Sequence, residues 1–399
     1  MRIAINGTGV AGPTLAYWLR HYGHEPVLFE SAPALRTGGY IIDFWGVGYE
    51  VARRMGLEAQ LQAKGYAMDR LSLVDAGGEE TSGMGLDAMR ELVGGRFTTI
   101  ARGDLAALVY GACEGIESHF GTFIVELQEA DSGVSAMLSD GTTRDFDLVI
   151  GADGLHSHIR RLMFGNTDCE KPLGVHVAAF RVAGYPRRDE LTYVSHTVLQ
   201  KQVARVSLRD DQTLFLLTFR SELLPDRFKP SKVKPSEIKP SEVKQALRQI
   251  YADVEWEMPE ILQCLAACDD VYFDSVSQIH LDHWTQGRAA LIGDAAACAS
   301  LLAGEGTGLA MTEAYVLAGE LQRANGDFAK AFAEYEHKLK GFLEEKQHSA
   351  LKMASFFAPQ SKFAIKVRDW GIALASYPFL TKLVAGRSIR DDFDLPDYQ

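Results

Sequence analysis

The sequence is poor in the features that mark secreted, membrane-spanning and nucleic-acid-binding proteins. Its five cysteines, an odd number in 399 residues, argue against a framework of disulfide bonds and for a reducing compartment. No apolar run reaches the roughly 18 residues of a membrane span, and a strand-like segment starts at residue 2, which leaves no room for a signal peptide. Lys and Arg total 41 against 53 Asp and Glu, a net charge of −12 that draws the chain to neither nucleic acid nor anionic lipid. We therefore expect a soluble, cytoplasmic protein with no nucleic-acid or membrane partner.

The sequence also lacks a recognisable metal motif. Cys264 and Cys268 are spaced to share a helix face, but no second pair of cysteines or histidines near them completes a site. His280 and His283 fall in a turn with no carboxylate triad around them, so we expect surface positions rather than metal binding. What the chain does have is 47% hydrophobic residues, enough for two domains or one elaborated domain.

The first thirty residues carry the clearest positive signal. A strand, Arg2–Asn6, runs into Gly7-Thr8-Gly9-Val10-Ala11-Gly12, which fits G-x-G-x-x-G and opens a helix that continues through Tyr22. The next strand, Pro26–Glu30, ends in a carboxylate. In such a unit the glycines let a pyrophosphate approach the backbone, and the acid accepts hydrogen bonds from a ribose. The pattern predicts a dinucleotide site, with a purely structural turn as the alternative, and it leaves NAD and FAD equally open.

Two later stretches add candidate contacts to this site. Arg36 and the pair Gly38-Gly39 follow the second strand, where a loop could cover a ligand. Arg36 would face a ribose or phosphate, or be a solvated surface arginine. Arg102 stands at a strand-to-helix junction, from which its guanidinium can reach a phosphate or the polar edge of a ring.

Glycine and aspartate recur at the ends of two further buried strands. The strand Asp147–Gly151 leads into Asp153-Gly154, with Ser157 and Arg160 on the helix that follows. Open α/β sheets bind ligands outside the carboxyl ends of their strands, so this loop is a second candidate for the same site.

The third such loop follows the strand Arg288–Ile292. It begins with Gly293-Asp294 and continues through Gly304-Glu305-Gly306-Thr307-Gly308 into the helix Leu309–Arg323. An aspartate at a strand end can hold a polyol hydroxyl. Glycines before a helix present N–H groups to a ring carbonyl or a developing anion.

Between the second and third loops the pattern changes to consecutive strands. The predicted strands are Ala178–Val182, Leu191–Val194, Gln202–Leu208, Thr213–Arg220 and Phe273–Leu281. Strands without intervening helices predict an antiparallel sheet and a distinct region. Earlier in the chain, Leu71–Asp75 and Arg96–Ile100 are predicted strands that bound a mobile, glycine-rich stretch, Gly77–Gly95. The aromatic residues expected to wall a large pocket in the sheet are Phe180, Tyr193, Phe215 and Phe219.

The segment Lys229–Lys244 repeats Lys-Pro-Ser-x-(Val/Ile), with Pro230, Pro235 and Pro240 five residues apart. Proline at this density predicts an exposed, extended linker. A basic patch is the alternative, and the interspersed glutamates favour a solvated insertion. Ser241 is predicted to cap the helix that follows.

The three glycine loops, in this order, resemble those of the class A flavin-dependent monooxygenases, the single-component aromatic hydroxylases of the para-hydroxybenzoate hydroxylase type. The resemblance spans nearly the whole chain. Within that family it is most similar to the tetracycline-inactivating and polyketide-tailoring branch. The stretches that carry this closer likeness are Tyr17-Trp18-Leu19, Gly38-Gly39, Arg102-Gly103-Asp104-Leu105 and Leu395-Pro396-Asp397-Tyr398.

The resemblance implies a resident FAD and a transient NADPH or NADH. The glycine turn would hold the pyrophosphate, Glu30 the adenosine ribose, Arg102 the ribityl–phosphate side and Asp294 the ribityl chain. The turn at Gly304–Gly306 would face the flavin pyrimidine edge, and the Asp153 loop with Arg160 would support FAD and the visiting nicotinamide cofactor. The residues implied to contact the cofactor are Gly7, Gly9, Val10, Ala11, Gly12, Glu30, Ser31, Arg36, Gly39, Arg102, Asp153, Gly154, Gly293, Asp294, Gly304, Gly306 and Thr307.

The sequence departs from the family at three positions. Ala297, Leu301 and Gly308 stand where members often carry histidine or tyrosine, proline and asparagine. Leu301 would lie near the oxygen-reacting face of the flavin. The sequence also shows no obvious acid–base pair for deprotonating a phenol, so the chemistry would rest chiefly on the flavin.

The predicted fold class is mixed α/β, a Rossmann-like FAD-binding domain with an antiparallel-sheet substrate domain and a C-terminal helix. The predicted domains are residues 1–70, 96–172 and 275–350 for FAD binding, 71–95 and 173–274 for substrate binding, and 351–399 as a C-terminal helical segment. In that segment Leu339–Phe357 and Lys362–Ala375 read as helices separated by Pro359, and they either roof a substrate cavity or pack on the core.

The resulting functional hypothesis is an FAD-dependent monooxygenase that consumes NAD(P)H and hydroxylates a bulky aromatic, polyketide-like substrate through a flavin C4a-hydroperoxide. An FAD-dependent reductase or dehydrogenase is one alternative, and a non-catalytic flavoprotein that sequesters an aromatic ligand is another. The five tryptophans never form the paired motif of flavin halogenases. We expect a monomer or weak homodimer.

Overall fold

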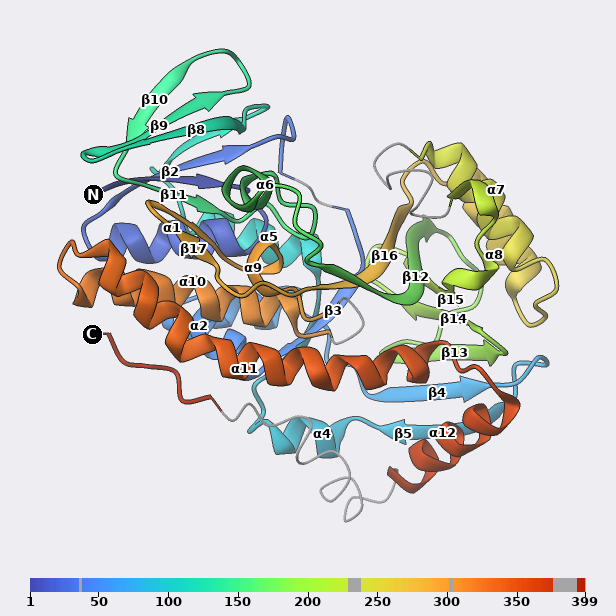
Figure 1. Ribbon diagram of the computed structural model, residues 1–399. Coiled ribbons are helices and arrows are strands. Elements are labelled where there is room, and N and C mark those ends of the chain that lie inside the picture. The colour runs from blue at the N-terminus through green and yellow to red at the C-terminus, as the bar shows by residue number, and fades with distance from the viewer. Residues whose placement is uncertain (36–37, 229–237, 301–303, 376–392, 399) are drawn as a thin grey trace.

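Two β-sheets of different construction set the architecture, and they lie side by side (Figure 1). The computed structural model describes residues 1–35, 38–228, 238–300, 304–375 and 393–398. Arg36 and Leu301, the prolines Pro230 and Pro235, and most of the Lys-Pro-Ser repeat therefore lie outside the described residues. The expected mixed α/β fold class is confirmed, whereas the division into three domains stays a prediction.

The first sheet has six strands in the order β17-β18-β11-β1-β2-β7 and is parallel except for β17. Its strands are β1 (Arg2–Asn6), β2 (Glu25–Glu30), β7 (Glu117–Phe120), β11 (Leu148–Gly151), β17 (Thr285–Gln286) and β18 (Ala289–Leu291). The register places Asn6 beside Gly151, and Gly151 beside Leu291. Because parallel strands end at one edge, the three glycine loops meet there although they are far apart in the sequence.

Helices cover one face of this sheet and a three-stranded meander covers the other (Figure 1). The helices are α1 (Ala11–His21), α5 (Arg102–Gly111) and α10 (Gly306–Arg323), and the meander is β8 (Ile124–Ala130), β9 (Gly133–Leu138) and β10 (Thr143–Phe146). Leu15, Trp18 and Leu19 recur at i, i+3 and i+4 and form the buried stripe of α1, and Tyr22 at its C-cap is half-buried. The Trp18 ring packs edge-on against Tyr315 of α10, with ring centroids 4.9 Å apart, so α1 and α10 are fixed together.

The second sheet has seven strands in the order β16-β12-β15-β14-β13-β4-β5 and is antiparallel except where β13 meets β4. Its strands are β4 (Arg70–Val74), β5 (Glu80–Gly85), β12 (Glu170–Ala183), β13 (Thr192–Val198), β14 (Lys201–Ser207), β15 (Gln212–Arg220) and β16 (Tyr272–Ile279). The predicted antiparallel sheet is confirmed. The predicted mobile stretch Gly77–Gly95 is wrong, because it forms β5 and the helix α4 (Asp87–Leu92). Backbone pairing with β4 makes β5 a strand in spite of its glycines.

The back face of the second sheet, which carries Phe180, Phe215 and Phe219, is covered by α7 (Pro240–Ile250) and α8 (Met258–Ala267). Helix α7 begins at Pro240 with Lys239 as its N-cap, so the predicted cap at Ser241 and the predicted extended linker at Pro240 are wrong. Proline suits the first helical position because its missing N–H has no partner there in any case. The Glu242 carboxylate instead accepts the Lys239 backbone N–H at 3.1 Å.

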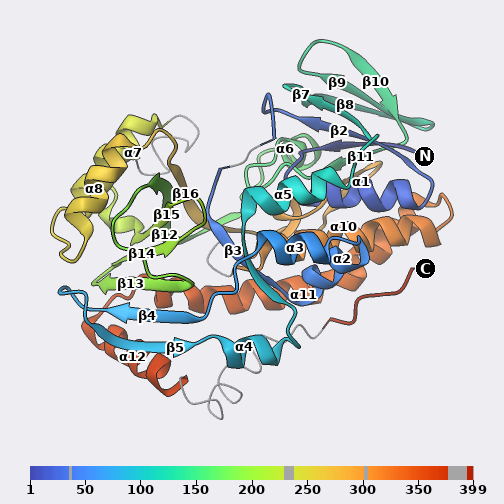
Figure 2. The same ribbon diagram turned by 180° about the vertical axis from the view of Figure 1, so that it is seen from behind.

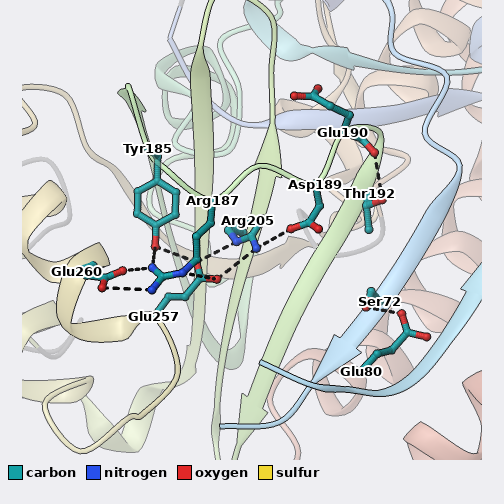
Figure 3. A network of polar contacts seen from close by, with 10 residues as sticks. All are labelled: Ser72, Glu80, Tyr185, Arg187, Asp189, Glu190, Thr192, Arg205, Glu257 and Glu260. Carbon is teal, nitrogen blue, oxygen red and sulfur yellow. Dashed lines mark hydrogen bonds and ion pairs between the residues drawn. The ribbon is translucent and has the colours of Figure 1, made fainter. Parts of the chain in front are cut away.

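A buried ion-pair network holds α8 against this back face (Figure 3). Arg205 of β14 donates from Nε and Nη2 to the Glu257 carboxylate at 2.9 and 3.2 Å, and the Tyr185 hydroxyl donates to it at 2.8 Å. Both charged side chains are buried, so each provides the partner that the other needs away from water. Arg205 lies on the same face of the sheet as Phe215, and its contact with Glu257 stabilises the packing of α8 on that face.

Two features join the sheets. The antiparallel pair β3 (Ile41–Trp45) and β6 (Phe97–Ala101) lies between them, and α11 (Phe328–Phe357) runs beneath both (Figures 1 and 2). Helix α12 (Lys362–Ala375) then packs on β5, so the two predicted C-terminal helices are confirmed. The remaining elements are α2 (Gly46–Arg54), α3 (Glu58–Lys64), α6 (His158–Phe164), α9 (Asp294–Ala297) and 3-10 turns at Ser221–Leu223 and Asp226–Phe228. Among the described helices, none combines the length and the apolar character of a bilayer span.

Candidate FAD-binding and active site

The glycine turn after β1 has the shape that a pyrophosphate requires. A Cβ on Gly7 would stand 2.3 Å from the Ala152 carbonyl oxygen, and one on Gly12 would stand 2.0 Å from the Gly7 carbonyl oxygen. These two glycines are therefore required by close backbone contacts, and Gly7 also has a φ of +117°. Gly9, in contrast, has no atom within 4 Å of its Cβ position, so the turn leaves open space in front of the N-terminus of α1. That open, N–H-lined space fits a dinucleotide phosphate group.

Glu30 is fixed beside this turn at the end of β2. Its Oε2 accepts hydrogen bonds from the Thr8 backbone N–H and hydroxyl, both at 2.9 Å. Its Oε1 accepts from the Ala32 N–H at 2.9 Å and from the Ser31 hydroxyl at 3.2 Å. The carboxylate is thus held at the position where the sequence predicts a ribose contact, and Ser31 contributes by holding Glu30.

Asp153 lies against the glycine turn but is occupied by protein groups. Its Oδ2 accepts from the Asn6 side-chain amide at 3.1 Å and from the backbone N–H groups of His158 and Ile159 at 2.8 and 3.1 Å. The Ser157 hydroxyl also donates to it. Asp153 therefore ties the start of α6 to the end of β1. Gly154, with a φ of +78°, makes the turn.

Arg160 is a buried link between the second and third loops. Its Nη1 donates to the Ala295 carbonyl oxygen at 3.0 Å and its Nη2 to the Leu155 carbonyl oxygen at 2.5 Å. With 6% of its surface exposed, the side chain fixes the loop framework from within.

The start and the end of the third loop come together, because Asp294 lies next to Gly306. Asp294 begins α9, and a Cβ on Gly306 would lie 3.6 Å from its Oδ1, so the aspartate stands at the N-terminus of α10. Thr307 follows Gly306 in the first turn of that helix. Gly293 has a φ of +63°, which aims the strand end toward this position. The arrangement can hold a polyol through the carboxylate and a ring edge through the helix N–H groups.

Glu313 of α10 supports this loop, and sequence reasoning missed it. Its Oε2 accepts the Gly293 backbone N–H at 2.8 Å and the Tyr335 hydroxyl at 3.2 Å. The side chain is 1% exposed, and burial raises its pKa to about 8. No local pattern marks it, because both partners come from distant parts of the chain.

Arg102, Tyr40 and Tyr272 lie near Asp294 of the third loop. The Arg102 backbone N–H donates to the Tyr40 carbonyl oxygen at 3.0 Å, which brings Gly39 and Tyr40 to the start of α5. The rings of Tyr40 and Tyr272 lie 5.4 Å apart, and burial raises the pKa of Tyr40 to about 12. Asp294 raises this pKa and Arg102 lowers it, so both charges face the tyrosines.

The predicted pocket aromatics divide between the two faces of the second sheet. Phe180, Phe215 and Phe219 are at most 2% exposed in the core beneath α7 and α8. Contrary to the prediction, these three side chains have no surface left for a ligand. Tyr193 lies on the front face, defined by Ala179, Val206, Leu214, Leu216 and Tyr193, which packs against Tyr40 and Ile41. Alternation along strands puts neighbouring residues on opposite faces, and the sequence did not reveal which face looked toward the glycine loops.

Asp43 is a second acid that sequence reasoning missed. It lies on β3 in a small cavity whose lining includes Trp45, Gly48, Gly304 and Gly308. Asp43 therefore lines the same cavity as the turn predicted to face a flavin ring. Its hydrogen-bond partners come from other elements, so the sequence around it gave no signal.

His280 and His283 are exposed, as predicted, and all five cysteines are free thiols. Over the described residues no cluster of His, Cys, Asp or Glu has the makings of a metal site. The donors that converge at the sheet edge are instead backbone N–H groups, hydroxyls and single carboxylates. This donor set suits an extended dinucleotide, and the individual contacts remain predictions.

Comparison with known proteins agrees with this geometry. Residues 1–331 match the FAD binding domain family. The chain is 30% identical over 413 residues to a flavin-dependent monooxygenase of Legionella longbeachae serogroup 1 (strain NSW150), covering 100% of this chain and 98% of that protein. The crystal structure of tetracycline destructase Tet(51) is similar with a TM-score of 0.82 at 30% identity, covering 100% and 99% of the two chains. Klebsiella pneumoniae HpxO complexed with FAD and uric acid shares the fold, with a TM-score of 0.79 at 20% identity over 98% and 96% of the chains.

Proposed function

The chain belongs to the FAD-dependent monooxygenases, and from this premise we propose that it hydroxylates a bulky, flat, largely apolar aromatic substrate with NADPH or NADH as electron donor. The observation that carries the proposal is the meeting of three glycine loops at one sheet edge, next to a second sheet with an apolar front face. The similarity to a tetracycline destructase supports a polycyclic substrate class.

The chain's own residues would bind and orient the reactants. The turn from Gly7 to Gly12 would hold the FAD pyrophosphate, Glu30 the adenosine ribose and Asp294 the ribityl chain. When bound, FAD supplies the redox chemistry between the nicotinamide cofactor and oxygen. The N-terminus of α10 would present N–H groups and a positive dipole end to negative charge on the ring.

The front face of the second sheet would hold the substrate. Leu216 is the partly exposed apolar side chain of this face, above the buried Val206 and Leu214, and Tyr193 adds a hydroxyl group to it. Apolar walls exclude water from the reacting atoms, and a few polar groups set the orientation of a flat ring system.

The direct test uses the purified, FAD-loaded protein with tetracycline and with hydroxyanthraquinones as probes. We expect NAD(P)H oxidation to rise when a suitable probe is added and one atom of ¹⁸O₂ to appear in the product. NAD(P)H oxidation that yields only hydrogen peroxide with every probe would overturn hydroxylation and favour a reductase or oxidase.

A pair of variants tests the placement of the cofactor. Gly9→Leu adds a side chain whose Cβ has no protein atom within 4 Å, and it should abolish FAD binding by blocking the pyrophosphate. Gly111→Leu makes the same change at another open position, at the end of α5, and should keep FAD. Circular dichroism checks that both fold, and the flavin absorbance per protein measures the cofactor. Retention of FAD by Gly9→Leu would contradict the assignment.

A further inference from the structure

An ion pair joins the turn that we propose faces the flavin ring to the long helix α11. The Lys346 Nζ lies 2.9 Å from Glu305 Oε2, and the two side chains are only 11% and 18% exposed. Glu305 is the N-cap residue of α10 and stands between Gly304 and Gly306, the glycines of that turn. The Lys346 ammonium group also lies over the Phe342 ring, 5.6 Å from its centroid. Two opposite charges are therefore held together at the turn, largely out of water.

Two buried glutamines fix this part of α11 against the third loop. Gln347 Nε2 donates to the backbone carbonyl oxygens of Ile279 and Cys298, at 2.7 and 3.2 Å. Gln278 Nε2 donates to the carbonyl oxygens of Ala299 and Gln347, at 2.7 and 2.6 Å. Both glutamines are at most 4% exposed. The start of the third loop, α11 and β16 are thus tied together, and the ammonium group of the ion pair has a fixed position.

Stability alone is a weak reason for a buried ion pair at this position. Taking two charges out of water costs free energy that their mutual attraction often fails to recover. The N-terminus of α10 already favours the Glu305 carboxylate, because unpaired N–H groups and the positive dipole end lie there. Lys346 is therefore not required to keep this acid ionised, and the effect of its charge falls on the turn itself.

Several carboxyl groups stand around this turn. Asp294 lies beside the N-terminus of α10, and Asp43 lines the same cavity as Glu305. The charge of Arg102 acts near Asp294, and that of Lys346 acts at Glu305. A flavin ring gains negative charge when it is reduced, so nearby charges set how readily it accepts electrons. With Lys346 in place, the charge of Glu305 is largely cancelled.

Resting on the proposed placement of FAD, we propose that the Glu305–Lys346 ion pair sets the reduction potential of the flavin by keeping the turn beside its ring close to neutral. A hydride from NAD(P)H carries two electrons and one proton to the ring, which gives NAD(P)⁺ and an anionic reduced flavin, so charge and atoms balance. An uncancelled Glu305 carboxylate would disfavour that anion, and an uncancelled Lys346 ammonium would favour it. Both residues act through their charges, and neither takes part in the transfer.

The test compares the reduction potentials of FAD-loaded variants with no substrate and no oxygen present. Each protein is reduced slowly together with a reference dye of known potential, and absorbance gives the reduced fraction of each. Lys346→Met leaves the Glu305 charge uncancelled, so the equilibrium should shift about tenfold toward oxidised flavin, roughly 30 mV lower for a two-electron couple. Glu305→Gln leaves the Lys346 charge uncancelled and should shift the equilibrium by a similar factor toward reduced flavin.

Three further variants serve as controls. Lys346→Arg keeps the positive charge and should behave as the wild type. The double variant that combines Lys346→Met with Glu305→Gln removes both charges and should return the potential close to the wild-type value. Lys330→Met makes the same change at an exposed position in the first turn of α11. It lies about 24 Å away along the helix and should leave the potential unchanged.

Opposite shifts in the two single variants, cancelled in the double variant, would support the proposal, because general loosening of the turn would move both potentials the same way. Shifts of the same sign, or an unchanged potential in either single variant, would overturn it. Loss of FAD from either single variant would assign the pair a purely structural role and would also overturn it. Flavin absorbance and circular dichroism show whether each variant is loaded and folded. Hydroxylation is tested separately by the ¹⁸O₂ experiment, so the two proposals can fail independently.

Discussion

Among single residues, Glu313 shows how a buried acid can support the loop that we propose holds the cofactor. Its carboxyl group receives the Gly293 N–H and the Tyr335 hydroxyl, and Tyr335 is also bonded to the Leu291 carbonyl oxygen at 3.0 Å. The end of β18 is therefore fixed by a network that is fully inside the protein. Such a group stabilises the loop by hydrogen bonding, while burial disfavours its charge.

This environment predicts an unusual pH dependence of stability. The folded protein keeps the Glu313 proton up to about pH 8, whereas the unfolded chain releases it near the ordinary value of 4.5. The Glu313 contribution to stability is therefore fully present below the lower value and falls as pH rises through this window, by up to about 1.4 kcal/mol per pH unit. Glu313→Gln should remove this fall because a neutral amide carbonyl still accepts both hydrogen bonds.

The measurement is urea unfolding of wild type and variant at pH 5.5 and pH 7.5. The free-energy difference between the two proteins should change with pH in favour of Glu313→Gln at the higher pH. Glu345→Gln, at an exposed position of α11, is the control and should track the wild type. Parallel pH curves for Glu313→Gln and the wild type would show that the buried acid does not titrate as argued.

At the scale of whole elements, the contact between α2 and α10 depends on two glycines, Gly48 and Gly308. A side chain would fit at one of these positions but not at the other. A Cβ on Gly48 would stand 2.2 Å from the Gly308 Cα, whereas a Cβ on Gly308 would come no closer than 3.6 Å to any neighbour. Gly308 is one of the three departures from the family pattern. Its backbone lies close to that of α2 because Gly48 has no side chain. The contact lies beside Trp45 and Gly304, so it also sets the position of the proposed ring-facing turn.

Alanine at the two positions should therefore have opposite effects. Gly48→Ala must push α2 away from α10 and should destabilise the protein by about 1–3 kcal/mol, with weaker FAD binding. Gly308→Ala meets only ordinary contacts in a helix and should be neutral or stabilising by up to about 1 kcal/mol. Thermal unfolding and FAD titration of both variants check this. Equal losses in the two proteins would contradict the asymmetry.

For the whole molecule, residues 393–398 dock across the helices α2 and α10 beside the first sheet. The Tyr398 hydroxyl donates to Glu320 at 2.6 Å, and its ring fills the space above Gly319, where a Cβ would come within 2.2 Å of it. The Pro396 carbonyl oxygen accepts from Arg54 and from the Tyr315 hydroxyl, both at 2.9 Å. Helix α12, which precedes this tail, lies on the other sheet. The C-terminal region thus contacts both halves of the molecule.

Gly319→Ala should expel Tyr398 from its site and release the tail. We expect a loss of about 1–3 kcal/mol in the free energy of unfolding and faster removal of the C-terminal residues by carboxypeptidase. Gly341→Ala is the matched control, since it lies in α11 with open space around it and should stabilise by roughly 0.5–1 kcal/mol. A tail that resists the protease in Gly319→Ala would mean that Tyr398 does not anchor it.

Much of the fold was predictable because its signals are local. The turn from Gly7 to Gly12, the buried stripe of α1 and the strand ends before Asp153 and Asp294 follow from residue spacing. The helix-breaking Pro359 also marked the gap between α11 and α12. The prediction failed at β5, whose glycine-rich sequence becomes a strand only through pairing with β4, and at α7, whose first residue is a proline read as linker.

The sequence by itself indicated a dinucleotide site, since a strand followed by a glycine turn and a helix N-terminus places its N–H groups within a few residues of one another. Only the tertiary structure decided which side chains from distant elements meet. Asp43, Thr99 and Tyr193 come from three separate elements, and Glu313 meets Gly293 and Tyr335 across the core. It also showed that Phe180, Phe215 and Phe219 face the helices behind the sheet. The physical reason is that strand alternation and long-range packing set the direction of a side chain, and neither is encoded in its immediate neighbours.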